Sequence, residues 1–158
     1  MSNTVTLADL IGRLELKAGL RDSDFLTPAE KIDLLNDSLF RVHDMLVGAH
    51  QGYYESKETY AVVSGTADYP LPGNFYRPLK VKALYQEREV KLDEYTLEDD
   101  GAWEPRYTLP TTDTVTLLYR LVARKLRLRG PDGRAPTSDG TVYLYYARQF
   151  ERLVNLTD

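Results

Sequence analysis

The chain has 158 residues, a net charge of −4 at pH 7 and no cysteine. Its length fits one folded domain with enough apolar content to bury a core, and the lack of cysteine excludes disulfides, thiolate metal sites and cysteine nucleophiles. The slightly acidic balance does not indicate a nucleic-acid partner. No apolar run approaches the roughly 18 residues of a membrane-spanning helix, and the first residues lack the pattern of a signal peptide. We therefore expect synthesis in the cytoplasm and no membrane partner.

Two stretches near the N-terminus predict helices. Residues 6–19 begin with the threonine and aspartate of a capping box, and apolar residues then recur at three- and four-residue intervals up to a glycine. Residues 27–30 give a stronger start signal, because a threonine cap precedes a proline and a glutamate. The apolar spacing over residues 32–46 predicts a long amphipathic helix of about six turns. We expect it to end between residues 48 and 52.

The rest of the chain is dominated by short strand patterns. Alternating residues 60–62, turn-forming residues 64–66 and proline-rich residues 69–75 predict a β-hairpin, a corner and a third strand within residues 59–84. Further along, the pattern predicts a second hairpin (79–84 and 89–92), a strand pair (106–109 and 114–119), strand in preference to helix (121–129), a long loop (130–140) and a last strand (142–147).

This order of elements predicts an α+β fold. N-terminal helices, one of them long and amphipathic, are followed by an antiparallel β-sheet or a small β-sandwich. We expect a single domain over residues 1–158, with a helical part (1–52), a β part (53–147) and a C-terminal tail (148–158).

Residue patterns typical of catalysis or metal binding are missing from the sequence. It has no glycine-rich phosphate loop, no His-Glu-x-x-His motif and no nucleophile elbow. Its two histidines, His43 and His50, lie on one predicted helix about 10 Å apart by helical rise, which is too far to chelate one metal. We expect both at the surface or in an interface. The sequence therefore predicts neither an enzyme nor a bound cofactor or metal.

Two charge clusters are the candidate interaction residues. The acidic cluster consists of Asp93, Glu94, Glu98, Asp99, Asp100 and Glu104. The basic cluster consists of Arg120, Arg124, Lys125, Arg127, Arg129 and Arg134, of which Arg124, Lys125, Arg127 and Arg129 are the candidate interface residues. The simplest interpretation is two solvated faces, or ion pairs within one molecule, each pair worth well under about 1 kcal/mol. Two others stay open: the clusters meet between neighbouring copies, or the basic cluster faces the phosphate backbone of DNA in a channel.

Aromatic residues raise a further possibility. Tyr53-Tyr54, Trp103 and Tyr145-Tyr146 would suit a carbohydrate- or peptide-binding platform. Aromatic side chains at strand spacing more often pack within the protein.

Several short motifs together resemble one family. Leu34-Leu35-Asn36-Asp37-Ser38-Leu39, residues 62–66 and Asp68-Tyr69-Pro70-Leu71-Pro72-Gly73-Asn74-Phe75 follow one another as they do in the head-to-tail adaptor proteins of tailed bacteriophages, also called connector or head-completion proteins. Pro105-Arg106-Tyr107-Thr108-Leu109 and Val142-Tyr143-Leu144-Tyr145-Tyr146-Ala147 resemble later strands of the same proteins. The resemblance covers residues 27–153.

The resemblance implies a structural virion protein of the neck, between capsid and tail, made in the host cytoplasm. Such proteins form a ring, usually of twelve copies, that joins the portal to the tail. The implied partners are other copies of the chain, the portal protein, tail or nozzle proteins, and packaged DNA that passes through without sequence-specific binding. The helices and the C-terminal tail would dock on the portal, and the β region would build the ring wall. A stopper or tail-terminator subunit is the alternative within the neck, and a carbohydrate- or peptide-binding module is the alternative from another class.

Overall fold

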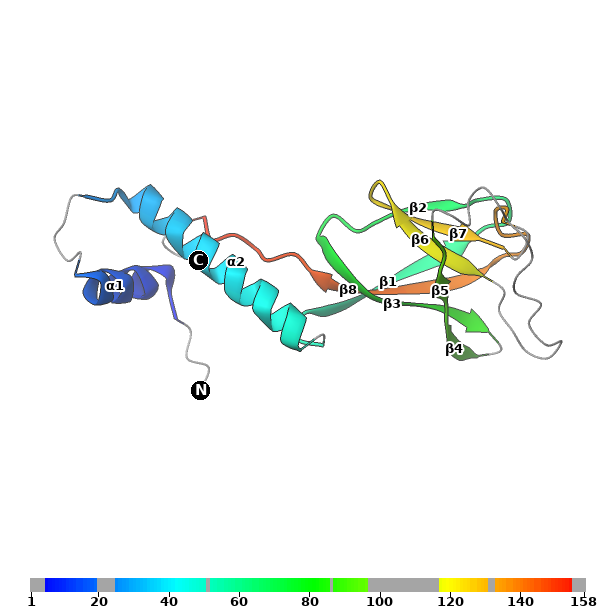
Figure 1. Ribbon diagram of the computed structural model, residues 1–158, viewed down its shortest axis with the longest axis horizontal. Coiled ribbons are helices and arrows are strands. Elements are labelled where there is room, and N and C mark those ends of the chain that lie inside the picture. Colours follow the sequence, from blue (N-terminus) through cyan, green and yellow to red (C-terminus); the bar gives the residue numbers. More distant parts are fainter. Residues whose placement is uncertain are drawn as a thin grey trace. The chain divides into compact units, whose positions relative to one another are not determined.

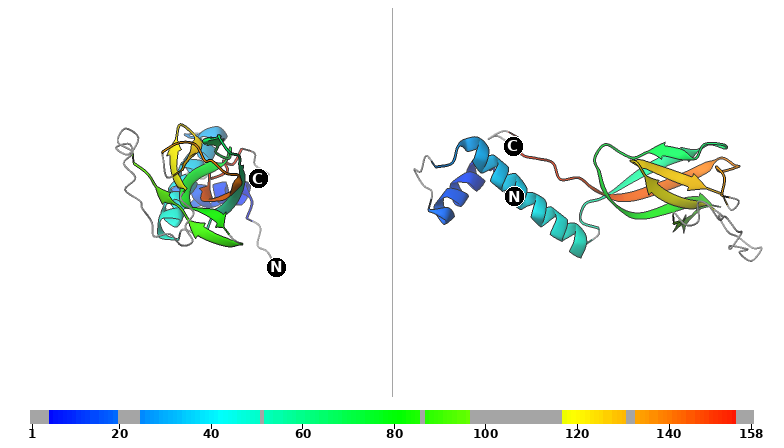
Figure 2. Two further views of the ribbon diagram at one scale, coloured as in Figure 1. Left: turned by 90° about the vertical axis from the view of Figure 1, so that its right-hand side faces the viewer. Right: turned by 45° about the horizontal axis from the view of Figure 1, so that its top comes forward.

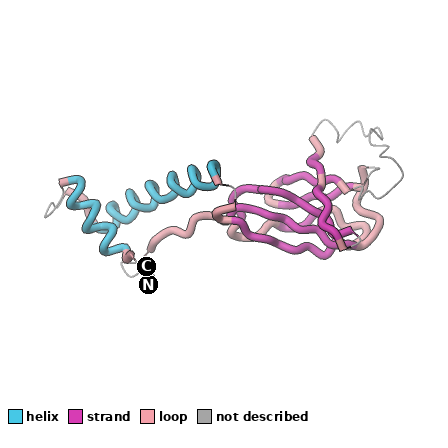
Figure 3. The backbone as a smooth tube through the Cα atoms, turned by 90° about the horizontal axis from the view of Figure 1, so that it is seen from below, coloured by secondary structure: helices cyan, strands magenta, loops and turns pink. Residues whose placement is uncertain are grey.

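The computed structural model describes residues 5–19, 25–50, 52–85, 87–96, 117–130 and 133–154. The chain divides into two compact units, a helical unit of residues 1–50 and 150–158 and a β unit of residues 51–149. The described helices all belong to the first unit and the described strands to the second (Figure 3). This order confirms the predicted α+β class.

The helical unit contains α1 (Leu7–Ala18) and α2 (Pro28–Ala49). Both begin at the capping boxes that the sequence predicts, because the side chains of Thr6 and Thr27 accept hydrogen bonds from the backbone N–H groups three residues later. Gly19 ends α1 with a φ of 67°, a left-handed conformation that glycine adopts without steric cost. Lys31 of α2 and Glu15 of α1 form an ion pair at 2.6 Å.

The two histidines lie in different environments. His50 is exposed at the end of α2, but His43 is only 1% exposed and its ring lies 6.1 Å from that of Phe150. Of the two positions expected for His43, surface or interface, the solvent-exposed surface is therefore wrong. The cause is helical periodicity, because His43 falls on the face of α2 that also buries Asn36 and Val47.

The β unit contains two four-stranded sheets (Figure 1). The first sheet has the order β1 (Glu55–Val62), β8 (Gly140–Arg148), β3 (Phe75–Tyr85) and β4 (Arg88–Lys91), and all its strand pairs are antiparallel. The second sheet has the order β2 (Asp68–Pro70), β7 (Lys125–Arg129), β6 (Leu118–Val122) and β5 (Asp93–Glu94). In it β5 runs parallel to β6, and the other pairs are antiparallel.

The two sheets share one hydrophobic core and form a small sandwich (Figure 2). Val142, Leu144 and Tyr146 of β8 point inward, and β3 adds Val81 and Ala83 from the same sheet. The second sheet contributes the following buried side chains: Tyr69 of β2 and Leu126 and Leu128 of β7. The alternation of strand side chains places every second residue of β7 and β8 in this core.

The hairpin predicted for residues 59–84 is wrong. β1 pairs with β8, whereas β2 pairs with β7 of the other sheet. The turn at Ser64 and Gly65 bonds to a distant loop, since Ser64 N–H donates to Asp139 Oδ1 and Gly65 N–H donates to the Pro136 carbonyl. The Tyr69 hydroxyl accepts from Val63 N–H and holds the crossing between the sheets.

Other strand predictions hold in part. The hairpin over 79–84 and 89–92 is confirmed by β3 and β4, and the last strand by β8. Residues 121–129 form strand, as predicted, but a turn at Ala123 and Arg124, both with positive φ, divides them between β6 and β7. Residues 106–109 and 114–116 lie outside the described part of the chain.

Leu144→Ala tests the shared core. Leu144 is 0% exposed at the centre of β8, so its truncation leaves a cavity that the two packed sheets fill only in part. We expect the free energy of unfolding of the β unit to fall by about 2–5 kcal/mol, measured by urea denaturation. Leu84→Ala is the matched control, because Leu84 is 40% exposed, and it should cost less than about 1 kcal/mol. Equal losses in the two variants would contradict this core.

Candidate interaction surfaces

Three members of the basic cluster share one face of the second sheet. Lys125, Arg127 and Arg129 alternate along β7 with Leu126 and Leu128, which are fully buried. The three basic side chains therefore share the outer face of the sheet. This placement agrees with the alternation seen in the sequence.

Arg127 forms an ion pair within its own chain. Its guanidinium donates two hydrogen bonds to the Asp68 carboxylate on neighbouring β2, at 2.7 and 3.1 Å. The Lys125 ammonium lies 3.8 Å from the same carboxylate. The Arg127 hydrogen bonds, with the positive charges around them, hold the pKa of Asp68 below its ordinary value of 3.8. Asp68, a carboxylate partner of Arg127, does not belong to the acidic cluster.

Arg129 and Arg120 cover a buried tyrosine. The Tyr95 side chain, 3% exposed, lies beneath both guanidinium groups, whose central carbons are 5.7 and 5.9 Å from the ring centre. Arg129 Nε also donates to the Tyr95 hydroxyl at 3.3 Å, and Arg129 donates to the Gly133 carbonyl. Arg129 therefore ties β7 to the residue after β5 and to the following loop.

The described part of the acidic cluster lies on the same sheet. Asp93 and Glu94 form β5, and β6 separates them from β7 and its basic residues. The other four carboxylates, Glu98, Asp99, Asp100 and Glu104, lie outside the described residues. The described members of the acidic cluster and the basic residues of β7 therefore lie on one sheet with β6 between them.

The first sheet carries a second charged surface, which the sequence analysis did not identify. We call it the lysine-tyrosine face; it comprises Lys57 of β1, Tyr143 and Tyr145 of β8, Lys80 and Lys82 of β3, and Glu89 and Lys91 of β4. The strand register brings these side chains to one side, because Tyr145 lies opposite both Lys57 and Lys80. In the next row, Lys82 lies opposite both Tyr143 and Lys91.

Lysine ammonium groups cover the two tyrosine rings of this face. Lys57 Nζ lies 3.6 Å from the centre of the Tyr143 ring, and Lys80 Nζ lies 4.4 Å from the centre of the Tyr145 ring. Such contacts are attractive because the ring face is electronegative. The aromatic surface is therefore already occupied by cations of the same chain.

Glu89 is the hub of the lysine-tyrosine face. Its carboxylate accepts hydrogen bonds from Lys82 at 2.8 Å, from Lys57 at 2.9 Å and from the Tyr145 hydroxyl at 2.8 Å. These three donors, Lys82 first, lower the pKa of Glu89 to about 2. The face thus keeps a fixed negative charge among its lysines at every physiological pH.

The expected aromatic platform is divided by the strand geometry. Tyr145 lies on the outer face of β8, whereas Tyr146 is 4% exposed, packs against Phe75 and donates to Asn74 Oδ1. Neighbouring residues of a strand point to opposite faces, so this pair cannot form one platform. The rings of Tyr53 and Tyr54 contact each other at 6.0 Å between centres. Trp103 lies outside the described residues.

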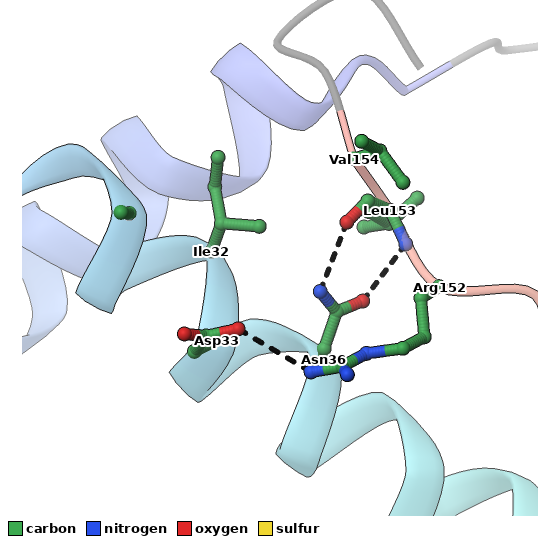
Figure 4. Close-up of a pocket in the computed structure, with 7 residues that line it drawn as sticks. Ile32, Asp33, Asn36, Arg152, Leu153 and Val154 are labelled. Carbon is green, nitrogen blue, oxygen red and sulfur yellow. Dashed lines mark hydrogen bonds and ion pairs between the residues drawn. The ribbon is translucent and has the colours of Figure 1, made fainter.

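In the helical unit, Asn36 of α2 holds the segment after β8 in place (Figure 4). Asn36 Nδ2 donates to the Leu153 carbonyl at 3.0 Å, and Leu153 N–H donates to Asn36 Oδ1 at 2.8 Å. The amide thus satisfies both backbone groups of one extended residue, as a neighbouring strand would. Arg152 and Asp33 add an exposed ion pair at 3.3 Å beside it. A polar amide on the face of α2 that also buries His43 and Val47 is the sequence signal for this contact.

Across the described ranges there is no cluster of three or more His, Asp or Glu side chains placed to hold a metal ion. None of the helices that the structure describes has the length and apolar character needed to cross a membrane.

The β unit thus carries charged side chains on an outer face of each sheet, and within the helical unit Asn36 holds the tail segment. The chain matches the SU10 adaptor protein family over residues 5–158 and belongs to this family. It is therefore a head-to-tail adaptor of tailed phages, a structural component of the virion, and the resemblance noted in the sequence is confirmed. No curated protein matches the chain.

Asn36→Ala tests the contact with the tail segment. The substitution leaves the N–H and C=O groups of Leu153 without their partner, which costs about 1–3 kcal/mol when such groups are part-buried. We expect amide hydrogen exchange at Leu153 to speed up by about tenfold or more. Ser38→Ala is the control, because the Ser38 hydroxyl only donates to the Leu34 carbonyl of its own helix. Unchanged exchange in Asn36→Ala would show that the amide does not hold the segment.

Asp68→Asn tests the pairing of β2 with β7. Because the folded state depresses the pKa of Asp68, the carboxylate stabilises the protein above its unfolded-state value of 3.8, and this stabilisation is lost as the pH falls through the lower folded-state value. We expect Asp68→Asn to cost about 1 kcal/mol at neutral pH, since the pair is partly exposed, and to differ less from wild type in strong acid. Urea denaturation across the acidic range measures both, with Asp93→Asn on the same sheet as control.

Proposed function

We propose that this adaptor forms a ring of twelve copies that joins the portal to the tail and surrounds the path of the genome. The observation that carries the proposal is the family match over residues 5–158, which covers both units. A ring role also agrees with the charged side chains on the outer faces of both sheets, which can contact other proteins. It requires no catalytic group and no cofactor.

In this proposal the two units have different partners. The helical unit and its tail segment dock on the portal protein, and the β unit builds the ring wall and meets tail or nozzle proteins. Packaged DNA passes through the ring without sequence-specific binding. Any contact with it involves the phosphate charge, which is the same for every sequence, and not the edges of the bases. The assembled protein resides in the virion neck.

The charge clusters are the proposed subunit or channel interface. They comprise Asp93, Glu94, Glu98, Asp99, Asp100 and Glu104 on the acidic side and Arg124, Lys125, Arg127 and Arg129 on the basic side. Arg124 and Lys125 are exposed, so they are the members best placed to reach another molecule. Arg127 and Arg129 already bond to Asp68 and Tyr95 of their own chain, so they would keep the basic face in shape.

An affinity pull-down tests the partners. A tagged chain is recovered from cells that make the whole set of neck, portal and tail proteins, and the co-purified proteins are identified by mass spectrometry. We expect the portal protein together with further copies of the chain, visible as rings by negative-stain electron microscopy. An untagged chain in the same cells controls for non-specific recovery.

The same experiment separates the alternatives. Recovery of tail proteins without the portal would assign the chain to a stopper or tail-terminator position. A bait that returns alone and monomeric from cells full of assembled particles would contradict a neck role, and a glycan and peptide binding screen would then test a binding module. Arg124→Glu with Lys125→Glu distinguishes the two roles of the basic side, since loss of rings indicates a subunit contact and intact rings with impaired genome ejection indicate a channel contact.

A further inference from the structure

The lysine-tyrosine face has the chemistry of a docking surface for an acidic protein segment. Four lysines from three strands surround two carboxylates, Glu55 and Glu89, so the face carries a net positive charge. The lysines lie across the full width of the first sheet, from β1 to β4. With strands about 4.8 Å apart, this width is about 14 Å.

Two features of the face disfavour nucleic acids and sugars. The rings of Tyr143 and Tyr145 are covered by lysine ammonium groups, so a base or a sugar cannot stack on them. Glu89 stays ionised at the centre of the face because its pKa is about 2. A fixed carboxylate repels a phosphate backbone, whereas a protein surface with polar groups of both kinds can be arranged around it.

The chain itself supplies an acidic counterpart. Residues 1–50 and 150–158 contain ten Asp and Glu against six Lys and Arg. On α2, Asp33, Asp37 and Asp44 are all exposed and occupy one stripe with the exposed Phe40, because their spacing of four, three and four residues follows the helical period. We call this row the acidic stripe.

The two surfaces match in size as well as in charge. The acidic stripe runs from Asp33 to Asp44, eleven steps of 1.5 Å or about 16 Å of helix, close to the about 14 Å between β1 and β4. Lys80 and Lys91 lie on adjacent strands and are offset by two residues, which places them about 8 Å apart. Asp37 and Asp44 are about 10 Å apart along α2. Phe40 lies between them and would meet the tyrosine-bearing centre of the face.

We propose that the acidic stripe of one copy docks on the lysine-tyrosine face of the next copy. Because each chain offers one surface of each kind, the contact is head-to-tail, and repeated head-to-tail contacts close into a ring when the rotation permits. This inference rests on the proposed function, since it requires that copies of the chain assemble with one another. It assigns a specific contact to that assembly, distinct from the clusters on the second sheet.

A charge-swap experiment tests the contact. The sheet variant carries Lys80→Glu and Lys91→Glu, which spare the Glu89 network with Lys57 and Lys82. The helix variant carries Asp37→Lys and Asp44→Lys, which spares the ion pair of Asp33. Sedimentation velocity should show self-association weakened at least tenfold in each variant. Added salt should weaken the self-association of the wild type, because it screens exposed charges. Combining all four substitutions in one chain should restore association, because the charges on both surfaces are then reversed and attract each other again.

Control variants make the result specific. Arg88→Glu makes the same charge change on β4, but Arg88 faces the opposite side from Glu89 and Lys91, and it should leave association unchanged. Since the chain has no cysteine, a mixture of Asp37→Cys chains and Lys80→Cys chains should form disulfide-linked dimers between copies. Neither chain alone should do so to the same extent.

Several outcomes would overturn the proposal. These are a wild-type chain that stays monomeric at its highest soluble concentration, single-surface variants that associate like wild type, or a combined variant that fails to recover although it stays folded by circular dichroism. Weaker binding of double-stranded DNA by the sheet variant with unchanged self-association would assign the face to DNA instead. A pull-down with the sheet variant distinguishes the failure of this contact from the failure of the neck role. If the sheet variant associates like wild type and still recovers the portal, this contact is contradicted and the neck role is not.

Discussion

The structure depends on the pairing of β8 between β1 and β3. Both neighbours bond to β8 along most of its length, so the last strand of the chain closes the sheet that the first strand begins. The side chains of β8 alternate, with Leu144 and Tyr146 in the core and Tyr143 and Tyr145 on the outer face. One strand thus fixes the register of the core and of the lysine-tyrosine face together. A shift of one residue would exchange the two sets of side chains and destroy both.

The two charged faces differ in how firmly their charges are held. On the second sheet, Arg127 and Arg129 are engaged by Asp68 and by the buried Tyr95, which stiffens that face and leaves the exposed start of β7, at Lys125, to interact outward. On the first sheet, a single carboxylate, Glu89, gathers lysines from two strands. Such exposed pairs contribute little to folding stability. They do hold long side chains in fixed positions, which lowers the entropy that a partner must remove on binding.

Local signals in the sequence predicted the elements that depend on local chemistry. The threonine caps, Pro28 and the apolar spacing of α2 specify that helix without help from distant residues, and the alternation of β7 specified its basic face. The hairpin prediction failed because the bonds of Ser64 and Gly65 to Asp139 and Pro136 are not visible in local sequence. The lysine-tyrosine face was missed for a similar reason, since its residues come from four strands and meet only once the register is known. The burial of His43 could have been predicted from the helical period that predicted α2, because it places His43 on the same face as Asn36 and Val47.

The contrast between the two units explains why an adaptor is built this way. The β unit has a continuous core fed by both sheets, so it folds around its own apolar residues. In the described part of the helical unit, the fully or nearly buried apolar side chains are Leu7 and Val47, while Leu34, Val42 and Met45 of α2 stay exposed. Small units with little buried apolar area gain stability when they bind a partner in the folded state. The β unit therefore has a core of its own, whereas the described part of the helical unit leaves apolar side chains exposed that other proteins could cover. This division suits an adaptor, whose function is to connect other components of the virion.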